Sequence, residues 1–250
     1  MALIAASILD ADYGCLRHEV ERVAEAGVDA FTIDIMDGNF APRITIGDQH
    51  VAMIRAWINL PIEVHLMVNN PLKWAQRFCD AGADLVVFHA EAAEDPMAVV
   101  DVVRAEGRSV GVALLSETPV SLLSDQLLSA VDLVNLLAVP VGFGGAGFAA
   151  NTQERATELR RRFNAIGRDG AIEVDGGVKP SNAEVFVADG LDMLTVGTGI
   201  YHASDAREAV VVLKKKASGG NPIDARRRLA LFLSRPSQKR VHDVARHKAT

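Results

Sequence analysis

Cysteine is scarce in this chain of 250 residues, and long apolar runs and a basic leader are missing. The two cysteines, Cys15 and Cys79, show no metal-ligand spacing, so we expect reduced thiols in a cytoplasmic protein. No apolar run reaches the roughly 18 residues of a membrane span. No basic region precedes the apolar N-terminus, so Met1–Ser7 is interpreted as the start of a first strand and not as a signal peptide.

Net positive charge is also missing from residues 1–217. The net charge is −6, yet Ser218–Thr250 holds eight Lys/Arg against two Asp, a local +6, which leaves −12 for the other residues. An acidic body argues against nucleic acid as the main partner. We therefore expect partners other than nucleic acid or a membrane.

What the chain does contain is a regular alternation of short apolar runs and amphipathic helical patterns. The eight runs predict strands that begin near Ile4, Ala30, Ile62, Leu85, Ser109, Leu133, Ala171 and Met193. The helices predicted between and after them are Leu16–Ala26, Val51–Ile58, Leu72–Ala81, Met97–Glu106, Val120–Leu127, Gln153–Ile166, Asn182–Asp189 and Ala206–Lys216. Strict alternation predicts a parallel sheet with helical crossovers.

A repeated junction supports repeated βα units. Ala26-Gly27-Val28-Asp29, Ala81-Gly82-Ala83-Asp84 and Asp189-Gly190-Leu191-Asp192 each precede an apolar run, and Ala130-Val131-Asp132 is a looser copy. Each glycine suits a helix C-cap. Eight units in about 220 residues fit a (β/α)8 TIM barrel.

An open doubly wound sheet is the alternative fold. It would place a Gly-x-Gly-x-x-Gly turn after the first strand. The chain has Ser7-Ile8-Leu9-Asp10-Ala11-Asp12 there, which weighs against that fold. We predict a single barrel domain over residues 1–217 and a basic C-terminal extension over residues 218–250, with one helix at Asp224–Leu233 followed by a disordered end.

Polar residues follow several of the predicted strands. Catalytic groups of (β/α)8 barrels lie at the C-terminal ends of strands. Those ends supply Ser7, Asp34, His65, His89, Glu91, Asp175 and Thr198. A lone acid in such a place most often caps the next helix. Two acids and a histidine, each ending an apolar strand, instead predict a functional site, because buried charges need pairing or a metal.

Glycine clusters follow the last three predicted strands: Gly142-Phe143-Gly144-Gly145, Gly176-Gly177 and Gly197-Thr198-Gly199. Glycines let backbone N–H groups approach an anion closely. The loops after strands 7 and 8 are the frequent phosphate site of this fold. The clusters therefore predict a phosphorylated ligand.

From Ile4 to about Tyr201 the chain resembles the ribulose-phosphate 3-epimerase family. The motifs that carry the resemblance are Ala6-Ser7-Ile8-Leu9-Asp10-Ala11-Asp12, Asp34-Ile35-Met36-Asp37-Gly38-Asn39-Phe40, Val64-His65-Leu66-Met67, Gly142-Phe143-Gly144-Gly145 and Ile172-Glu173-Val174-Asp175-Gly176-Gly177-Val178-Lys179-Pro180. Their order and spacing together are specific for the superfamily and less so for the substrate.

The resemblance implies a barrel that epimerises a ketose 5-phosphate at C3 through a metal-stabilised enediolate. Asp34 and Asp175 would be the acid/base pair, and with His65 they would hold a divalent metal. The implied substrate contacts are Ser7, His65, Met36, Met67, Gly142, Phe143, Gly144, Gly145, Gly176, Gly177, Gly197 and Thr198. We expect a small-molecule sugar phosphate as ligand and a homo-oligomer as the assembly.

The departures from the family cluster near this site. Thr32 stands where the family usually has a histidine as fourth metal ligand, so we expect weak binding of Zn²⁺, Mn²⁺ or Fe²⁺. The other changes are Ala6 and Val141 for proline, Leu137 for methionine, Ala146 for glutamine and Arg43 for asparagine.

Two functional hypotheses remain. In the first, the protein is a sugar-phosphate epimerase that acts on ribulose 5-phosphate or on a different sugar phosphate. In the second, it is a metal-poor, non-catalytic relative that only binds sugar phosphates. The retained Asp34, His65 and Asp175 favour the first. A decarboxylase or synthase would want a lysine at a strand end, and none of the eight predicted strands has one.

Overall fold

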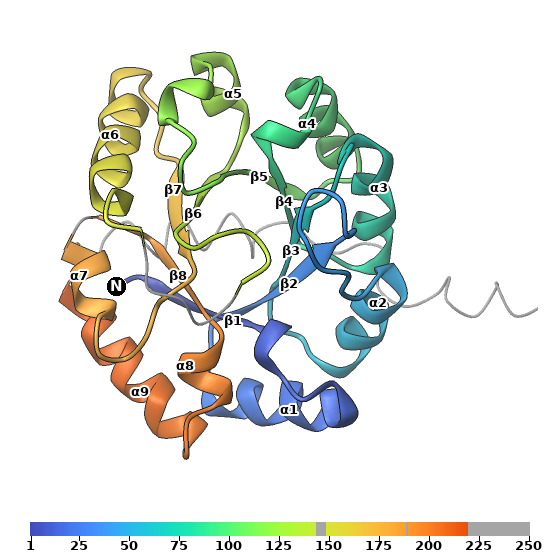
Figure 1. Ribbon diagram of the computed structural model, residues 1–250, viewed down its shortest axis with the longest axis vertical. Helices are drawn as coiled ribbons and strands as arrows, with labels where there is room; N and C mark the ends of the chain where they lie inside the picture. The colour runs from blue at the N-terminus through green and yellow to red at the C-terminus, as the bar shows by residue number, and fades with distance from the viewer. Residues whose placement is uncertain (144–148, 189, 220–250) are drawn as a thin grey trace, which may run out of the picture.

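Eight parallel strands close into a barrel with helices around its outside (Figure 1). This computed structural model describes residues 1–143, 149–188 and 190–219. The strands follow one another in chain order: β1 Leu3–Ser7, β2 Ala30–Met36, β3 Ile62–Met67, β4 Leu85–His89, β5 Ser109–Leu114, β6 Leu133–Leu137, β7 Ala171–Asp175 and β8 Met193–Val196. Because β1 pairs with both β2 and β8, the sheet has no free edge. The predicted TIM barrel is confirmed, and the open doubly wound alternative is wrong.

The helices of the described residues pack around the barrel. They are α1 Leu16–Ala26, α2 Asp48–Trp57, α3 Leu72–Ala81, α4 Pro96–Ala105, α5 Asp125–Ala130, α6 Thr152–Ala165, α7 Ala183–Ala188, α8 Thr198–Tyr201 and α9 Ala206–Lys216. Short 3-10 turns occur at Ile8–Asp10, Tyr13–Cys15, Ala90–Ala92, Val120–Leu122 and Ala217–Gly219. Within the described ranges, no helix combines the length and apolarity needed to cross a membrane.

Local capping signals set several helix ends. The carboxylates of Asp95 and Asp205 each accept two backbone N–H groups from the first turns of α4 and α9. Gly27 and Gly82 end α1 and α3 with φ angles of 94° and 110°, which residues with a Cβ rarely adopt. The chain therefore leaves each of these helices through a left-handed turn and enters the next strand directly.

Strand side chains alternate between two environments. Those that face outward, such as Ile33, Val64 and Phe88, join the large apolar core between the sheet and the helices. A second, smaller core fills the barrel interior and consists of Leu3, Ala5, Ala30, Leu85, Val87, Ala113, Leu133, Ala171 and Met193. Most of its members are the first residues of their strands, so apolar side chains close the N-terminal end of the barrel. Polar side chains take the C-terminal end.

The four repeated junction motifs share one structural role. Each ends in an aspartate directly before an even-numbered strand, at Asp29, Asp84, Asp132 and Asp192. Each carboxylate accepts a backbone N–H from the start of the preceding odd-numbered strand, donated by Ile4, Ile62, Val110 and Ile172 respectively. Each also pairs with a basic side chain, from Lys214, Arg55, Arg104 and Arg160 respectively. The sequence repeat is thus a repeated anchor between neighbouring strands and a helix.

The predicted element bounds are largely confirmed. Seven strands begin at the predicted residue, and β1 begins one residue earlier, at Leu3. The helix predicted over Val120–Leu127 is wrong. A 3-10 turn stands at its start, and the Ser124 side chain then accepts the Leu127 N–H and caps a new helix, α5. The helix α8 has no counterpart in the prediction. The helix predicted at Asp224–Leu233 and the end of the chain lie outside the described residues.

We predict that Asp132→Ala destabilises the fold by about 2–4 kcal/mol, because it removes a nearly buried carboxylate that binds Arg104 and the Val110 N–H. Urea unfolding measures the loss. The exposed Asp101→Ala in α4 is the control and should change stability by less than about 0.5 kcal/mol. Equal effects of the two substitutions would contradict the anchoring role.

Candidate active site and metal centre

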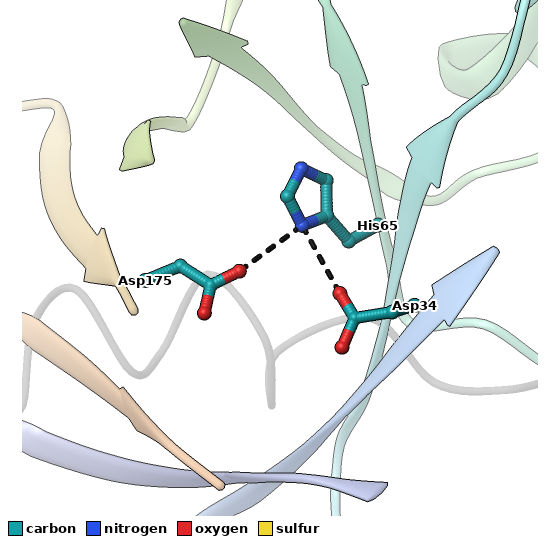
Figure 2. Close-up of side chains that lie close together, drawn as sticks. All are labelled: Asp34, His65 and Asp175. Carbon is teal, nitrogen blue, oxygen red and sulfur yellow. Dashed lines mark ion pairs between the residues drawn. The ribbon is translucent and has the colours of Figure 1, made fainter. Parts of the chain in front are cut away.

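Three side chains converge at the C-terminal ends of β2, β3 and β7. Asp34 and His65 are register partners on neighbouring strands, and Asp175 ends β7 across the barrel (Figure 2). His65 Nδ1 lies 3.3 Å from Asp34 Oδ1 and 3.2 Å from Asp175 Oδ2. One donor atom from each of the three residues falls within 4.8 Å of the other two. The three residues that the sequence singled out therefore form one cluster.

The donor atoms of this cluster fit a cation. Asp34 Oδ1 and His65 Nδ1 are buried, and neither makes a hydrogen bond of acceptable geometry in the described structure. The other Asp34 oxygen, Oδ2, accepts a hydrogen bond of 2.6 Å from the Ser7 hydroxyl. Two carboxylates and one imidazole are ligands that Zn²⁺, Mn²⁺ and Fe²⁺ all accept. A cation would satisfy the atoms that the protein leaves without partners.

The same geometry perturbs the protonation of the cluster. Burial lowers the pKa of His65, but the carboxylates of Asp175 and Asp34 outweigh burial and raise that pKa well above its usual range. Burial raises the pKa of Asp175, and the nearby His65 opposes this rise. A cation at the cluster would therefore compete with a proton on His65.

Thr32 lies one inward position before Asp34 on β2. Its side chain is fully buried, and its Oγ1 is 3.3 Å from Oγ1 of Thr195. Thr195 in turn donates a hydrogen bond to the Glu173 carboxylate. Thr32 thus belongs to a hydrogen-bonded layer beneath the site.

Sequence reasoning missed two acids in that layer, Glu63 and Glu173. They precede His65 and Asp175 by two residues, so the alternation of a strand directs them inward as well. Glu173 accepts hydrogen bonds from Asn135 and Thr195, whereas both Glu63 carboxylate oxygens are buried without a hydrogen bond. Burial raises the pKa of both glutamates, and each is raised further by a neighbouring acid. The spacing of two residues between each glutamate and the site residue after it was the signal that could have identified them.

A pocket opens above the cluster. Its lining includes eleven of the predicted site residues: Ser7, Asp34, Met36, Met67, Gly142, Phe143, Asp175, Gly176, Gly177, Gly197 and Thr198. His65 is fully buried and outside this lining. Met36 and Met67 pack with Ala41 into an apolar wall. Gly144 and Gly145 lie outside the described residues.

Two of the predicted glycines stand where a side chain would not fit. Gly176 has a φ of 103°, and a Cβ there would approach Val139 to 2.5 Å. A Cβ on Gly197 would clash with the Asp10 carboxylate. These glycines therefore let β7 and β8 end close against neighbouring loops.

The pocket also contains residues that the sequence reasoning did not select: Leu9, Asp10, Leu137, Val139, Val178 and Thr195. Burial raises the pKa of Asp10, while His202 and the backbone amide of Thr198 oppose the rise. At the rim, the exposed Arg43 donates to the carbonyl oxygen of Gly142 at 3.1 Å and so bridges the loops after β2 and β6. Asp10 thus adds a further acid to the pocket lining, and Arg43 places a cation beside Gly142 at its rim.

Comparison with known proteins assigns the chain to a family. The sequence model of the ribulose-phosphate 3 epimerase family matches residues 3–201. The chain belongs to the ribulose-phosphate 3-epimerase family. The ribulose-phosphate 3-epimerase of Bacillus subtilis (strain 168) is 36% identical over 211 residues, which cover 84% of this chain and 97% of that protein. The Escherichia coli (strain K12) enzyme is 35% identical over 209 residues, 83% of this chain and 92% of that protein. The chain is thus an isomerase of the ribulose-phosphate 3-epimerase type.

Several solved structures are similar to this chain in fold alone. The 3-keto-L-gulonate-6-phosphate decarboxylase from Vibrio cholerae O1 biovar El Tor aligns with a TM-score of 0.67 at 13% identity, over 88% of this chain and 99% of that one. The 3-hexulose-6-phosphate synthase from Salmonella typhimurium aligns with a TM-score of 0.62 at 17% identity, over 86% of this chain and 98% of that one. Family membership therefore rests on the closer sequence relatives.

We predict that Glu63→Gln stabilises the metal-free protein more at pH 8 than at pH 5. The folded wild type keeps a proton on Glu63, whereas the unfolded chain loses it above about pH 4.3, so wild-type stability falls as pH rises. Glutamine removes this penalty. Thermal unfolding at both pH values measures the difference, with the exposed Glu25→Gln as control. An equal shift at both pH values would contradict a protonated Glu63.

Proposed function

We propose that this protein epimerises a ketose phosphate at C3, in the manner of ribulose 5-phosphate 3-epimerase. The observation that carries the proposal is the approach of two carboxylates from well-separated strands. β1 and β8 stand between β2 and β7 on one side of the barrel, and β3 to β6 on the other. Asp34 and Asp175 reach toward His65 from these two directions (Figure 2).

The chemistry needs two such groups. The C2 carbonyl acidifies the C3 hydrogen of a ketose, so a carboxylate on one face removes it as a proton and leaves an enediolate. A carboxylic acid on the other face then donates a proton to C3 and inverts its configuration. One aspartate thus begins each turnover charged and the other protonated, and turnover exchanges these roles. The product state is therefore ready for the reverse reaction, and the starting protonation states are restored by proton exchange with solvent before the same direction is repeated.

Asp34, His65 and Asp175 would hold a divalent cation. When bound, such a cation supplies a Lewis acid for the negative charge that develops on the substrate oxygens. The protein's own groups complete the site. Ser7 fixes the carboxylate of Asp34 through its hydroxyl, and the wall of Met36, Met67 and Ala41 limits the access of water.

The phosphate would bind at the loops after β7 and β8. Gly176, Gly177, Gly197 and Thr198 line the pocket there, and this is the usual phosphate position of the fold. Gly142 lies across the mouth on the loop after β6. Backbone N–H groups at such glycines can approach an anion without obstruction from side chains.

A different sugar phosphate is the second candidate substrate. Asp10 lines the pocket, where its carboxylate would accept hydrogen bonds from sugar hydroxyls. Arg43 contacts Gly142 at the rim, where its guanidinium would meet an anionic group of the substrate. Either charge would favour a substrate with complementary hydroxyl or acidic groups. The reaction at C3 is the same in this case, and only the preferred chain length or substituent differs.

Asp34→Asn and Asp175→Asn should each lower kcat by about 10²–10⁴-fold while the fold is kept, because each removes one of the two proton carriers. A coupled assay of sugar-phosphate epimerisation measures the loss, and circular dichroism checks the fold. The exposed Asp101→Asn serves as control. Full activity in either active-site variant would refute the mechanism with two aspartates.

Thr32→His should tighten Mn²⁺ binding about tenfold or more, because an inward-facing imidazole at this position adds a ligand to the three already present. Calorimetric titration of the metal-free protein measures affinity. Thr32→Gln fills similar space with a poorer ligand and is the matched control. If histidine and glutamine give the same affinity, position 32 lies out of reach of the metal.

A further inference from the structure

A chain of polar contacts continues behind His65, away from the pocket. The Nε2 atoms of His65 and His89 lie 3.0 Å apart. The other ring nitrogen of His89, Nδ1, lies 3.4 Å from Glu91 Oε2. The second oxygen of Glu91 accepts the backbone N–H of Leu115 at 2.8 Å. Figure 2 shows how His65 is turned: its Nδ1 faces both aspartates, and its other ring nitrogen points away from them.

Only one arrangement of protons satisfies all of these polar contacts when His65 binds a cation. His65 then presents the lone pair of Nδ1 to the cation, so its proton lies on Nε2. His89 Nε2 must accept that proton, which places the His89 proton on Nδ1, where the Glu91 carboxylate accepts it. Two N–H groups facing each other at 3.0 Å would repel in this fully buried place.

Glu91 selects between the two tautomers of His89. The opposite tautomer would turn the lone pair of Nδ1 toward the Glu91 carboxylate, which is unfavourable. Burial raises the pKa of Glu91, but hydrogen bonds from His89, Thr118 and Leu115 outweigh it and lower the pKa to about 2. Glu91 is thus a fixed negative charge at the end of this series of polar contacts.

Ring contacts also hold the imidazoles in place. The rings of His65 and His89 stack with centroids 5.0 Å apart and an interplanar angle of 18°. Phe40 packs against His89 from another direction, with centroids 4.8 Å apart. Neither histidine is exposed, so solvent cannot replace these contacts. These ring contacts therefore fix the plane of the His65 ring from the side that faces away from the pocket.

We propose that His89 and Glu91 are positioning residues that fix the tautomer and ring plane of His65 and thereby strengthen cation binding by Asp34, His65 and Asp175. This inference rests on the proposed metal role of the site. Residues that hydrogen-bond to a metal-binding histidine typically contribute a factor of about 10–100 in metal affinity. Because the cluster has three protein ligands, a correctly oriented imidazole supplies a large share of its affinity for a cation.

The test is a titration of the metal-free protein with Mn²⁺, in which electron paramagnetic resonance measures the bound and free ion. His89→Phe keeps a ring but removes the acceptor, and should weaken Mn²⁺ binding by about 10–100-fold. His89→Gln places an amide oxygen near the position of Nε2 and should restore most of that loss. His50→Phe, at an exposed histidine in α2, should leave the affinity unchanged.

A second measurement needs no metal. Long-range ¹⁵N–¹H correlation of the histidine rings should show His89 with its proton on Nδ1 in the wild type. Unchanged Mn²⁺ affinity in His89→Phe, or a His89 proton on Nε2, would overturn the inference while leaving the aspartate mechanism intact. A wild type that binds no Mn²⁺ would overturn both the inference and the proposed metal role, and loss of activity in the aspartate variants would then still identify the proton carriers.

Discussion

Burial of ionisable groups at one end of the barrel is the constraint on which the site depends. Asp34, His65 and Asp175 are almost removed from water, and two further acids, Glu63 and Glu173, lie beneath them. Unpaired buried charges are costly, so this arrangement persists only with protons, mutual pairing or a cation to balance it. The two carboxylates raise the pKa of His65 and so favour a proton on it, and a divalent cation would take the place of that proton between them. The same electrostatics therefore link stability, metal binding and catalysis.

The N-terminal end of the barrel stabilises the strands that carry these groups. Apolar side chains close the N-terminal end of the barrel, and the four aspartates before the even-numbered strands bind the odd-numbered strands next to them. These anchors stand at the opposite end of the strands from the active site. The stable end of the barrel is thus separate from the reactive end, which is the usual division in this fold.

Much of this could be predicted from the sequence, because the signals are local. Alternating apolar runs and glycine caps fix strand starts and helix ends. Asp34, His65 and Asp175 lie at or near the C-terminal ends of strands that the topology brings together. Other features depend on three-dimensional packing. The capping role of Ser124 splits a segment that is amphipathic throughout, and the contact between His65 and His89 joins strands whose register the sequence does not state. The Asp10 carboxylate reaches the pocket through its packing against Gly197, which no spacing rule would indicate.

The central claim is that Asp34 and Asp175 exchange the hydrogen at C3 of a ketose phosphate. The most direct test is NMR of D-ribulose 5-phosphate with the protein, loaded with Mn²⁺ or Zn²⁺, in D₂O; the C3 resonance is followed in a Zn²⁺ sample or after Mn²⁺ is removed. The account predicts that deuterium replaces the C3 hydrogen while xylulose 5-phosphate forms. A protein shown to hold metal that leaves the C3 hydrogen in place, in this sugar and in a panel of other ketose phosphates, would contradict it.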